Sequence, residues 1–266
     1  MTSTRPPAGT ATSGDAGFVT ADVADGVATV RFGHPKGNSL PSDVLRRLAA
    51  TISELGADPN ARVVILRSEG TGAFCAGASF AELQAIGDAA TGKEFFMGFA
   101  RLILAMRRCP KFILTRVHGR AVGGGVGLVA ASDYAFALRD ASVRLSELAV
   151  GIGPFVVGPV IERKIGLGAF QTLAVDAATW RDAAWAERHG LYAQVLDSTN
   201  ELDAVLDRLA HTLARSNPEA MAQLKSVFWQ GTEHWDTLLD DRATMSGTLV
   251  LSGFTRRAIA AFSGRG

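Results

Sequence analysis

Residues 117–137 read VHGRAVGGGVGLVAASDYAFA, and this stretch carries the strongest structural signal in the chain. A glycine-rich turn is predicted over residues 119–127, between a strand at 112–117 and a short apolar helix. A further strand is expected around residues 134–138. Glycine is used where the backbone turns sharply or approaches another group closely. The stretch therefore predicts a strand–turn–helix–strand unit whose helix presents backbone N–H groups at its opening.

The segments before this stretch continue the alternation of strands and helices. Residues 27–32 (VATVRF) read as a strand, and residues 41–55 carry apolar side chains on one face of a helix. Residues 63–66 form a short apolar run, which is typical of a strand buried on both faces, and residues 93–107 are helical in pattern. This order of elements predicts an α/β fold.

The character of the chain changes after about residue 157, where helical patterns dominate. Apolar residues between Leu202 and Leu213 mark one helix, Asn217 and Pro218 begin another, and residues 250–262 close the chain. We expect a disordered lead over residues 1–16, an α/β core over 17–200 and a helical region over 201–266 that packs on a partner subunit.

Composition excludes several classes of function. The chain has 266 residues, with 27 Lys and Arg against 26 Asp and Glu, so its formal net charge is +1. That balance favours neither a nucleic acid nor an anionic membrane as a partner. The apolar stretch 121–138 contains Asp133 and four glycines, which favours a buried helix and strand over a membrane span. Two cysteines, Cys75 and Cys109, and an N-terminus without an apolar signal core predict a reducing, cytoplasmic setting.

Two near-motifs for cofactors fail on inspection. Residues 87–93 (GDAATGK) have phosphate-loop spacing, but Glu94 stands where Ser or Thr would bind Mg²⁺, and a helix rather than a strand is expected before them. Residues 123–128 (GGGVGL) lack the last glycine of a dinucleotide fingerprint. The five histidines form no ligand pair. We therefore expect no nucleotide, metal or other cofactor.

A second glycine turn, residues 73–79 (AFCAGAS), also follows a predicted strand. If its N–H groups and those of the turn at 120–127 converge on one point, they form an oxyanion hole that stabilises charge on a carbonyl oxygen. Close packing of helix on strand explains the same glycines, and spacing alone leaves both interpretations open.

Three segments taken together, AFCAGASF at 73–80, the stretch 117–137, and LSELAVGIGPF at 145–155, resemble the crotonase (enoyl-CoA hydratase/isomerase) superfamily. The similarity runs from about Val27 to the C-terminus. It implies a ClpP/crotonase-like spiral of β-β-α units, a helical C-terminal oligomerisation region, and a homotrimer or homohexamer. It also implies an acyl-CoA substrate whose thioester oxygen lies between the N–H groups of Ala78 and Gly124.

The resemblance also assigns the acid–base chemistry. Family hydratases commonly use two glutamates; the second matches Glu147, and the first would fall at Gly127, where the carboxylate is absent. Three reactions stay open: hydration in which Glu147 shares its work with an ordered water, isomerisation of an enoyl-CoA by Glu147 alone, and another enolate reaction such as decarboxylation. The combination of GGGVGL, LSE and PFVV resembles methylglutaconyl-CoA hydratase-like members and favours hydration. A non-catalytic acyl-CoA binder is the alternative outside enzymology.

The resemblance further places the adenine of CoA against the first glycine turn, with Ala76 and Phe80 as candidate contacts. Phe262 and Arg265 match loosely an aromatic and a basic residue supplied by a neighbouring subunit. His118 and Asp133 are candidates for a second acid, and both fit a packing or structural role better.

Overall fold

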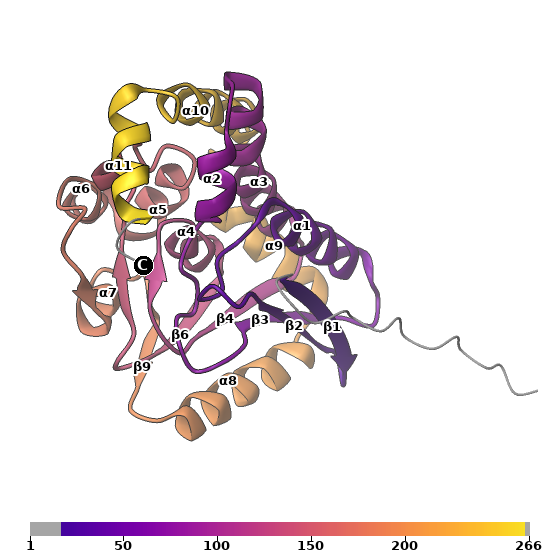
Figure 1. The fold of residues 1–266 in the computed structure, drawn as a ribbon. Helices are drawn as coiled ribbons and strands as arrows, with labels where there is room; N and C mark the ends of the chain where they lie inside the picture. The colour runs from indigo at the N-terminus through magenta and orange to yellow at the C-terminus, as the bar shows by residue number, and fades with distance from the viewer. Residues whose placement is uncertain (1–16, 264–266) are drawn as a thin grey trace, which may run out of the picture.

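The computed structural model describes residues 17–263, with side chains described as far as residue 261 (Figure 1). A six-stranded sheet in the order β1-β2-β3-β4-β6-β9 forms the centre of the fold. The first two strands pair antiparallel, and all other neighbours in this sheet are parallel. Its strands are β1 (Phe18–Ala24), β2 (Val27–Gly33), β3 (Val63–Ser68), β4 (Phe112–Val117), β6 (Tyr134–Leu138) and β9 (Gln194–Leu196).

Helices cover both faces of this sheet. Helix α8 lies on one face, where its residues Leu202 and Leu206 pack against apolar side chains of β2, β3, β4 and β6. Helices α1, α3 and α4 lie on the other face (Figure 1). The helices are α1 (Ser42–Ala57), α2 (Phe80–Ala85), α3 (Ala89–Arg108), α4 (Gly124–Ala131), α5 (Gly158–Ile165), α6 (Leu167–Val175), α7 (Ala183–Arg188), α8 (Thr199–Ala214), α9 (Pro218–Phe228), α10 (Trp235–Leu249) and α11 (Gly253–Ser263), with a 3-10 turn η1 (Leu148–Val150).

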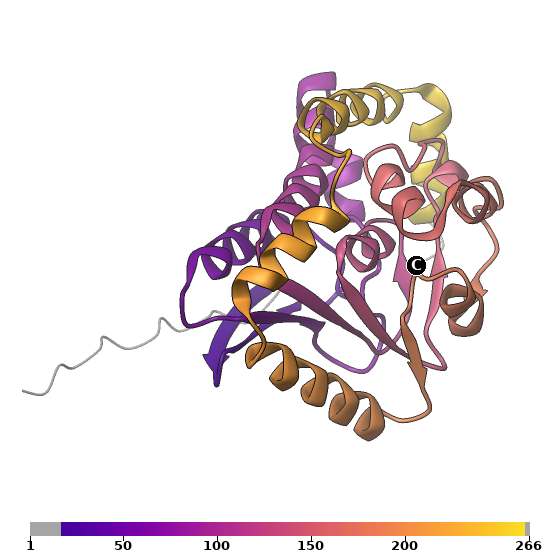
Figure 2. The same cartoon turned by 180° about the vertical axis from the view of Figure 1, so that it is seen from behind.

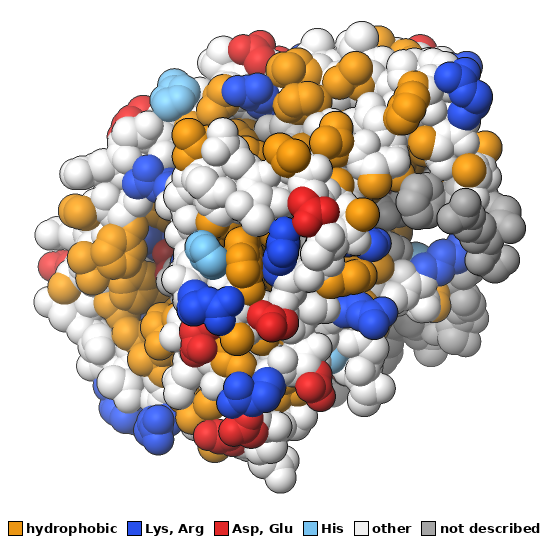
Figure 3. All heavy atoms as spheres, turned by 90° about the vertical axis from the view of Figure 1, so that its left-hand side faces the viewer, with side chains coloured by type: hydrophobic (Ala, Val, Ile, Leu, Met, Phe, Trp, Pro, Cys, Tyr) orange, Lys and Arg blue, Asp and Glu red, His pale blue; other side chains and the backbone are white. Residues whose placement is uncertain are grey.

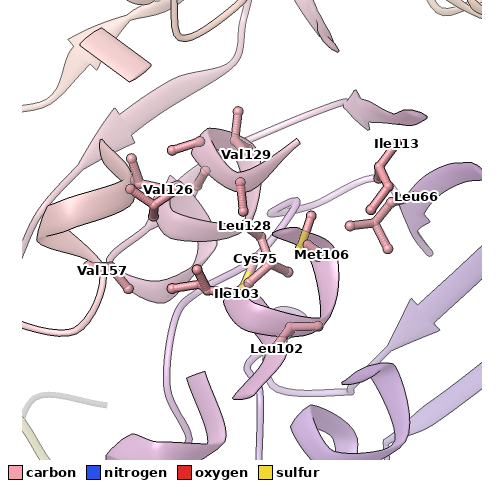
Figure 4. Close-up of a cluster of buried hydrophobic side chains, with 14 of the residues drawn as sticks. Leu66, Cys75, Leu102, Ile103, Met106, Ile113, Val126, Leu128, Val129 and Val157 are labelled. Atoms are coloured by element: carbon pink, nitrogen blue, oxygen red, sulfur yellow. The ribbon is translucent and has the colours of Figure 1, made fainter. Parts of the chain in front are cut away.

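The largest hydrophobic cluster lies between the main sheet and the helices α3 and α4. Figure 4 shows side chains from both helices meeting those of the strands, with Cys75 and Val157 among them. The labelled members are Leu66, Cys75, Leu102, Ile103, Met106, Ile113, Val126, Leu128, Val129 and Val157. Because α4 is buried along its whole length, its apolar composition is explained by this packing. In the described part of the chain, no helix has both the length and the apolar character to cross a membrane.

A second sheet sets the geometry of the loops above the core. Its order is β5-β7-β8, with β5 (Ala121–Val122), β7 (Ser142–Arg144) and β8 (Arg181–Asp182). Strand β5 is parallel to β7, and β8 is antiparallel to it. The Gly123 N–H donates to the Arg144 carbonyl at 2.9 Å. This sheet therefore holds the start of α4 beside the segment that leads to Glu147.

The C-terminal helices return to the core after α8. Figure 2 shows α9 leading from α8, below the sheet, to α10 above it. Helix α10 crosses α3 so closely that a Cβ at Gly92 would lie 2.7 Å from the Gly247 carbonyl oxygen. The ion pair between Lys93 and Asp240, at 2.7 Å, spans the same crossing. Helix α11 then contacts α2 and η1, so it lies over the loops of the core.

The predicted elements are largely confirmed, but helices α5, α6, α7 and α10 and strands β1, β5, β7, β8 and β9 were not predicted from the sequence. The glycine-rich turn is shorter than predicted, because α4 begins at Gly124 and includes Gly127. Strand β1 was not predicted; nearly all of its residues are exposed, so its sequence has no alternation of apolar and polar residues. Strand β9 lies beyond residue 157 and still joins the main sheet. The expected disordered lead, residues 1–16, lies outside the described residues.

Candidate active site

Five residues singled out from the sequence line one cavity of about 120 Å³. They are Ala76, Ala78, Phe80, Gly124 and Glu147. The rest of the lining is Gly77, Leu83, Phe96, Phe99, Val122, Gly123, Ser146, Val150 and Ile152. Apart from a serine and a glutamate, every side chain in this lining is apolar.

Backbone hydrogen bonds hold the first glycine turn, residues 73–79, in place. The Leu40 N–H donates to the Gly77 carbonyl at 2.8 Å, and the Ala76 N–H donates to the Gly37 carbonyl at 3.0 Å. Gly77 has φ +91°, which L side chains rarely adopt, so glycine is required there. Ser79 caps the next helix, α2, by accepting from the Glu82 N–H.

The second glycine turn lies directly against the first. Cys75 exchanges hydrogen bonds with the Arg120 carbonyl at 3.1 Å and the Val122 N–H at 2.9 Å. A Cβ at Gly77 would lie 3.0 Å from the Val122 carbonyl oxygen and 4.0 Å from the Gly124 nitrogen. The two turns therefore lie side by side in close packing.

Two backbone amides at this junction lack backbone acceptors. Among the described residues, neither the Ala78 nor the Gly124 N–H donates to a carbonyl. Gly124 is the first residue of α4, and its cap Gly123, at φ +51°, offers no side chain. The partial positive charge of a helix N-terminus therefore adds to these donors at the cavity wall. Such an arrangement can stabilise negative charge that develops on a bound oxygen.

Glu147 supplies the carboxylate of the cavity. Its Oε2 is buried with no hydrogen-bond partner among the described residues, and its Oε1 lies 2.8 Å from where a Cβ at Gly123 would stand. Burial raises the pKa of the Glu147 carboxyl to about 7, against a smaller lowering by its own backbone N–H. A carboxyl with that pKa exchanges a proton readily at neutral pH.

Gly127 does not reach the cavity. A Cβ at this position would lie 2.7 Å from Val157 Cγ1 and 2.9 Å from Val157 Cβ. Val157 stands at the start of α5 and is buried. The side chain of Val157 therefore occupies the space into which any side chain at position 127 would point.

The other residues considered as acids lie elsewhere. Asp133 accepts from the Lys225 ammonium at 2.9 Å and from the Ile113 N–H at 2.7 Å, in a buried pair that fastens α9 to the core. His118 is not part of the cavity lining, and burial, with Arg116 and Arg67 nearby, lowers its pKa. The packing roles expected for both residues agree with these positions.

Three other features of the sequence have different outcomes. Residues 87–93 form the loop before α3 and its first turn, with the Asp88 side chain accepting from the Thr91 N–H, so their spacing reflects a capped helix. Cys75 is completely buried, and burial raises the pKa of its thiol to about 12, as expected for a packing residue. The Phe262 side chain and Arg265 lie outside the described residues.

The sequence did not identify the aromatic side chains that α3 contributes to the cavity. Phe96 and Phe99 lie on α3, and a Cβ at Gly124 would lie 2.0 Å from Phe99 Cε1. Val150 and Ile152 come from the turn after Glu147. The helical pattern of α3 was visible, but only the packed structure shows which of its side chains face the glycine turns.

Comparisons with known proteins agree on one family. Residues 22–250 match the family model described as enoyl-CoA hydratase/isomerase. A (7aS)-7a-methyl-1,5-dioxo-2,3,5,6,7,7a-hexahydro-1H-indene-carboxyl-CoA hydrolase from Mycobacterium tuberculosis is 30% identical over 202 residues, covering 76% of this chain and 80% of that protein. The mitochondrial methylglutaconyl-CoA hydratase of Rattus norvegicus is 30% identical over 200 residues, covering 74% of this chain and 63% of that protein.

A solved structure of similar fold supports the architecture. The crystal structure of enoyl-CoA hydratase from Bacillus halodurans superposes with a TM-score of 0.84 at 19% identity, covering 91% of this chain and 99% of that one. At that identity the likeness concerns the fold alone, and it agrees with the spiral α/β core and C-terminal helices expected from the sequence.

Proposed function

Because the chain belongs to the enoyl-CoA hydratase/isomerase family, we propose that it transforms an acyl-CoA thioester with Glu147 as its acid and base. The observation that carries this proposal is the position of Glu147. Its carboxyl, with a pKa of about 7, lies beside the start of α4, where the amides of Ala78 and Gly124, which have no backbone acceptor among the described residues, line the same cavity.

In this proposal the thioester oxygen accepts hydrogen bonds from the Ala78 and Gly124 amides. Withdrawal of electrons toward that oxygen acidifies the α-carbon and makes the β-carbon of an enoyl group electrophilic. The apolar lining strengthens both effects, because charges interact more strongly where water is excluded. A single carboxyl near neutrality is then able to move a proton to or from the α-carbon.

Hydration is the reaction that we propose first. Ionised Glu147 takes a proton from water as the oxygen of that water bonds to the β-carbon, and electrons move to the thioester oxygen. The protonated carboxyl then delivers the same proton to the α-carbon as the thioester carbonyl re-forms, which balances the addition of one water. The relative named methylglutaconyl-CoA hydratase, at 30% identity, supports this choice.

Isomerisation is the second candidate, and a specific observation favours it. Val157 fills the space beside Gly127, and the described lining offers only Ser146 beside Glu147 as a polar side chain to hold a water. In this reaction the carboxylate removes a proton from the α-carbon of a 3-enoyl-CoA and returns it to the γ-carbon. The double bond moves into conjugation with the thioester, and no water is consumed.

A substrate panel separates these candidates. Crotonyl-, 3-hexenoyl- and methylglutaconyl-CoA would be incubated with the protein, and the products resolved as hydrated or isomerised by chromatography and mass spectrometry. We expect turnover that Glu147→Gln abolishes while CoA-ester binding persists, and that Glu162→Gln, an exposed change on α5, leaves intact. Wild-type turnover by Glu147→Gln would refute the mechanism. Binding without turnover of any substrate would leave a non-catalytic acyl-CoA binder.

The remaining expectations form part of the same proposal. Ala76 and Phe80 line the cavity and are proposed as CoA contacts, with no cofactor beyond the CoA of the substrate, in a cytoplasmic setting. A homotrimer or homohexamer is proposed because large apolar side chains are exposed on α6, η1 and α11. Figure 3, which views the side of the molecule that carries α6 and α7, shows hydrophobic side chains among charged ones there. The exposed residues are Leu148, Leu167, Val175 and Phe254.

A further inference from the structure

The last helix of the described chain contacts the turn that carries Glu147. The turn runs over residues 147–152, and its backbone closes on itself through hydrogen bonds from the Val150 N–H at 3.2 Å and the Ile152 N–H at 2.9 Å to the Glu147 carbonyl. Gly151, at φ +83°, ends η1, and no backbone N–H of the described residues donates to its carbonyl oxygen. That oxygen needs a donor from another part of the chain.

Thr255 of α11 supplies the donor. Its Oγ1 donates to the Gly151 carbonyl at 3.0 Å, across 104 positions of sequence, and the residue is completely buried. The Ser252 hydroxyl donates to Thr255 Oγ1 at 3.0 Å and accepts from the Thr255 N–H at 3.2 Å. Thr255 therefore uses its single hydroxyl proton on Gly151 while accepting from Ser252.

The fit around Gly151 is tight. A Cβ at Gly151 would lie 2.6 Å from both Thr255 Oγ1 and Phe254 Cδ1, so α11 approaches the backbone of the turn directly. A second anchor lies further along α11, where the buried Ile259 packs in a cluster with Leu83 and Ile152, which also line the cavity. A polar contact and an apolar contact thus hold α11 to the wall of the site.

We propose that Thr255 is a positioning residue for Glu147: by fixing the Gly151 carbonyl, its hydroxyl holds the 147–152 turn so that the carboxyl faces the amides of Ala78 and Gly124. This inference rests on the proposed function of Glu147. Thr255 itself is not among the residues that line the cavity, so it acts through the turn.

The consequence for the Glu147 carboxyl follows from what surrounds it. Among the described lining, α2 contributes Phe80 and Leu83, α3 contributes Phe96 and Phe99, and the rest is backbone, small or aliphatic apart from Ser146. No charged side chain contributes to the shift of the Glu147 pKa, which has burial as its cause. A turn released from α11 admits water to the carboxyl, and its pKa falls toward 4.5, the ordinary value.

The test compares two pairs of proteins. Within each pair, the side chains at position 255 are similar in size and only one of them carries a hydroxyl group. The pairs are wild type with Thr255→Val, and Thr255→Ser with Thr255→Ala. Thr248→Val, which removes an exposed hydroxyl bonded within α10, is the matched control. Measurements are kcat and KM from pH 5.5 to 9, and the pKa of the Glu147 carboxyl in the ligand-free protein, by infrared difference spectroscopy against Glu147→Gln.

We expect the valine and alanine variants to lose about 10- to 100-fold in kcat, the range for a misplaced catalytic group, with a smaller change in KM. Their carboxyl pKa should fall below that of the wild type. Thr255→Ser and Thr248→Val should match the wild type in both. The proposal is overturned if the two variants without the hydroxyl keep the wild-type kcat and carboxyl pKa, or if Thr255→Ser is as impaired as Thr255→Ala.

Failure of this inference is distinguishable from failure of the proposed function. If Glu147→Gln is inactive and Thr255→Val is unaffected, only the positioning role is wrong. If Glu147→Gln retains turnover, the proposed function is wrong, whatever the Thr255 variants do. The infrared measurement needs no turnover, so it reports on the turn in either case.

Discussion

Replacing Glu147 with glutamine should make the protein more stable at alkaline pH while abolishing its turnover. The buried Oε2 of this carboxyl has no hydrogen-bond partner in the described part of the chain, and burial raises the pKa of the carboxyl from 4.5 to about 7. The folded protein therefore binds this proton more tightly than the unfolded chain does. The stabilisation that this bound proton gives the folded protein is full below about pH 4.5, decreases as the pH rises toward 7, and is absent above about pH 7.

The size of this effect follows from the two pKa values. A difference of one pKa unit corresponds to about 1.4 kcal/mol of free energy. The rise of the pKa from 4.5 to about 7 therefore means that the ionised carboxylate destabilises the folded protein by at most about 3 kcal/mol. Glutamine keeps the shape and removes the charge, but its amide also lacks partners in the cavity. We therefore expect a gain of about 1–3 kcal/mol at pH 8.5 and less than about 1 kcal/mol at pH 5.

Urea unfolding at pH 5, 7 and 8.5, at one protein concentration because association adds to stability, measures the difference between Glu147→Gln and wild type. Glu162→Gln serves as the control, since its side chain is exposed on α5, and it gives the effect of the same substitution outside the cavity. A Glu147→Gln variant no more stable than wild type at pH 8.5, or one whose advantage is the same at every pH, would refute the reasoning about burial of the charge.

Three further changes test how the site and its supports are built. Gly123→Ala should abolish turnover and cost about 1–3 kcal/mol of stability, because φ is +51° at this position and the new Cβ would lie 2.8 Å from the Glu147 carboxylate. Steady-state kinetics measures the first effect and urea unfolding the second, and unchanged kinetics would contradict the geometry described for this site. Gly127→Ala should cost about 1–3 kcal/mol of stability, because the new methyl group overpacks against Val157. Adding Val157→Ala should restore part of that loss in urea unfolding. If it restores none, the clash with Val157 is not the cause of the loss. Lys225→Met leaves a buried carboxylate at Asp133 without its cation, with an expected loss of about 3–5 kcal/mol, and a melting temperature like that of the wild type would contradict this.

The sequence located the elements whose burial is uniform or one-sided. Residues 63–66 were recognised as a strand because both faces of β3 are buried, and the helix at 218–228 matches its prediction. Strand β1 was not predicted, because it is an edge strand that is exposed over most of its length and its sequence has no apolar pattern. Helix α10 was not predicted because its buried face includes Ala243, Ser246 and Gly247, which are small or polar and give little apolar pattern.

The candidate site divides in the same way. Ala76, Ala78, Phe80, Gly124 and Glu147 were all singled out through the resemblance of their motifs to the crotonase superfamily, and all line one cavity. Phe99 and Thr255 could not be found, because each acts on a segment distant in sequence. The sequence could not show that Val157 fills the space beside Gly127 either, because the two residues are 30 positions apart along the chain.

By itself the sequence determined the backbone chemistry of this protein: glycines where φ is positive or the chain turns, a helix that starts with free amides, and one carboxylate in a turn after a strand. These properties are local, because allowed φ and ψ and capping depend on a few consecutive residues. The tertiary structure decided how far apart these groups lie and how dry their surroundings are. Burial of Glu147 raises its pKa, Val157 closes the space at Gly127, and α11 reaches the turn at Gly151, because packing brings together side chains that no local pattern relates.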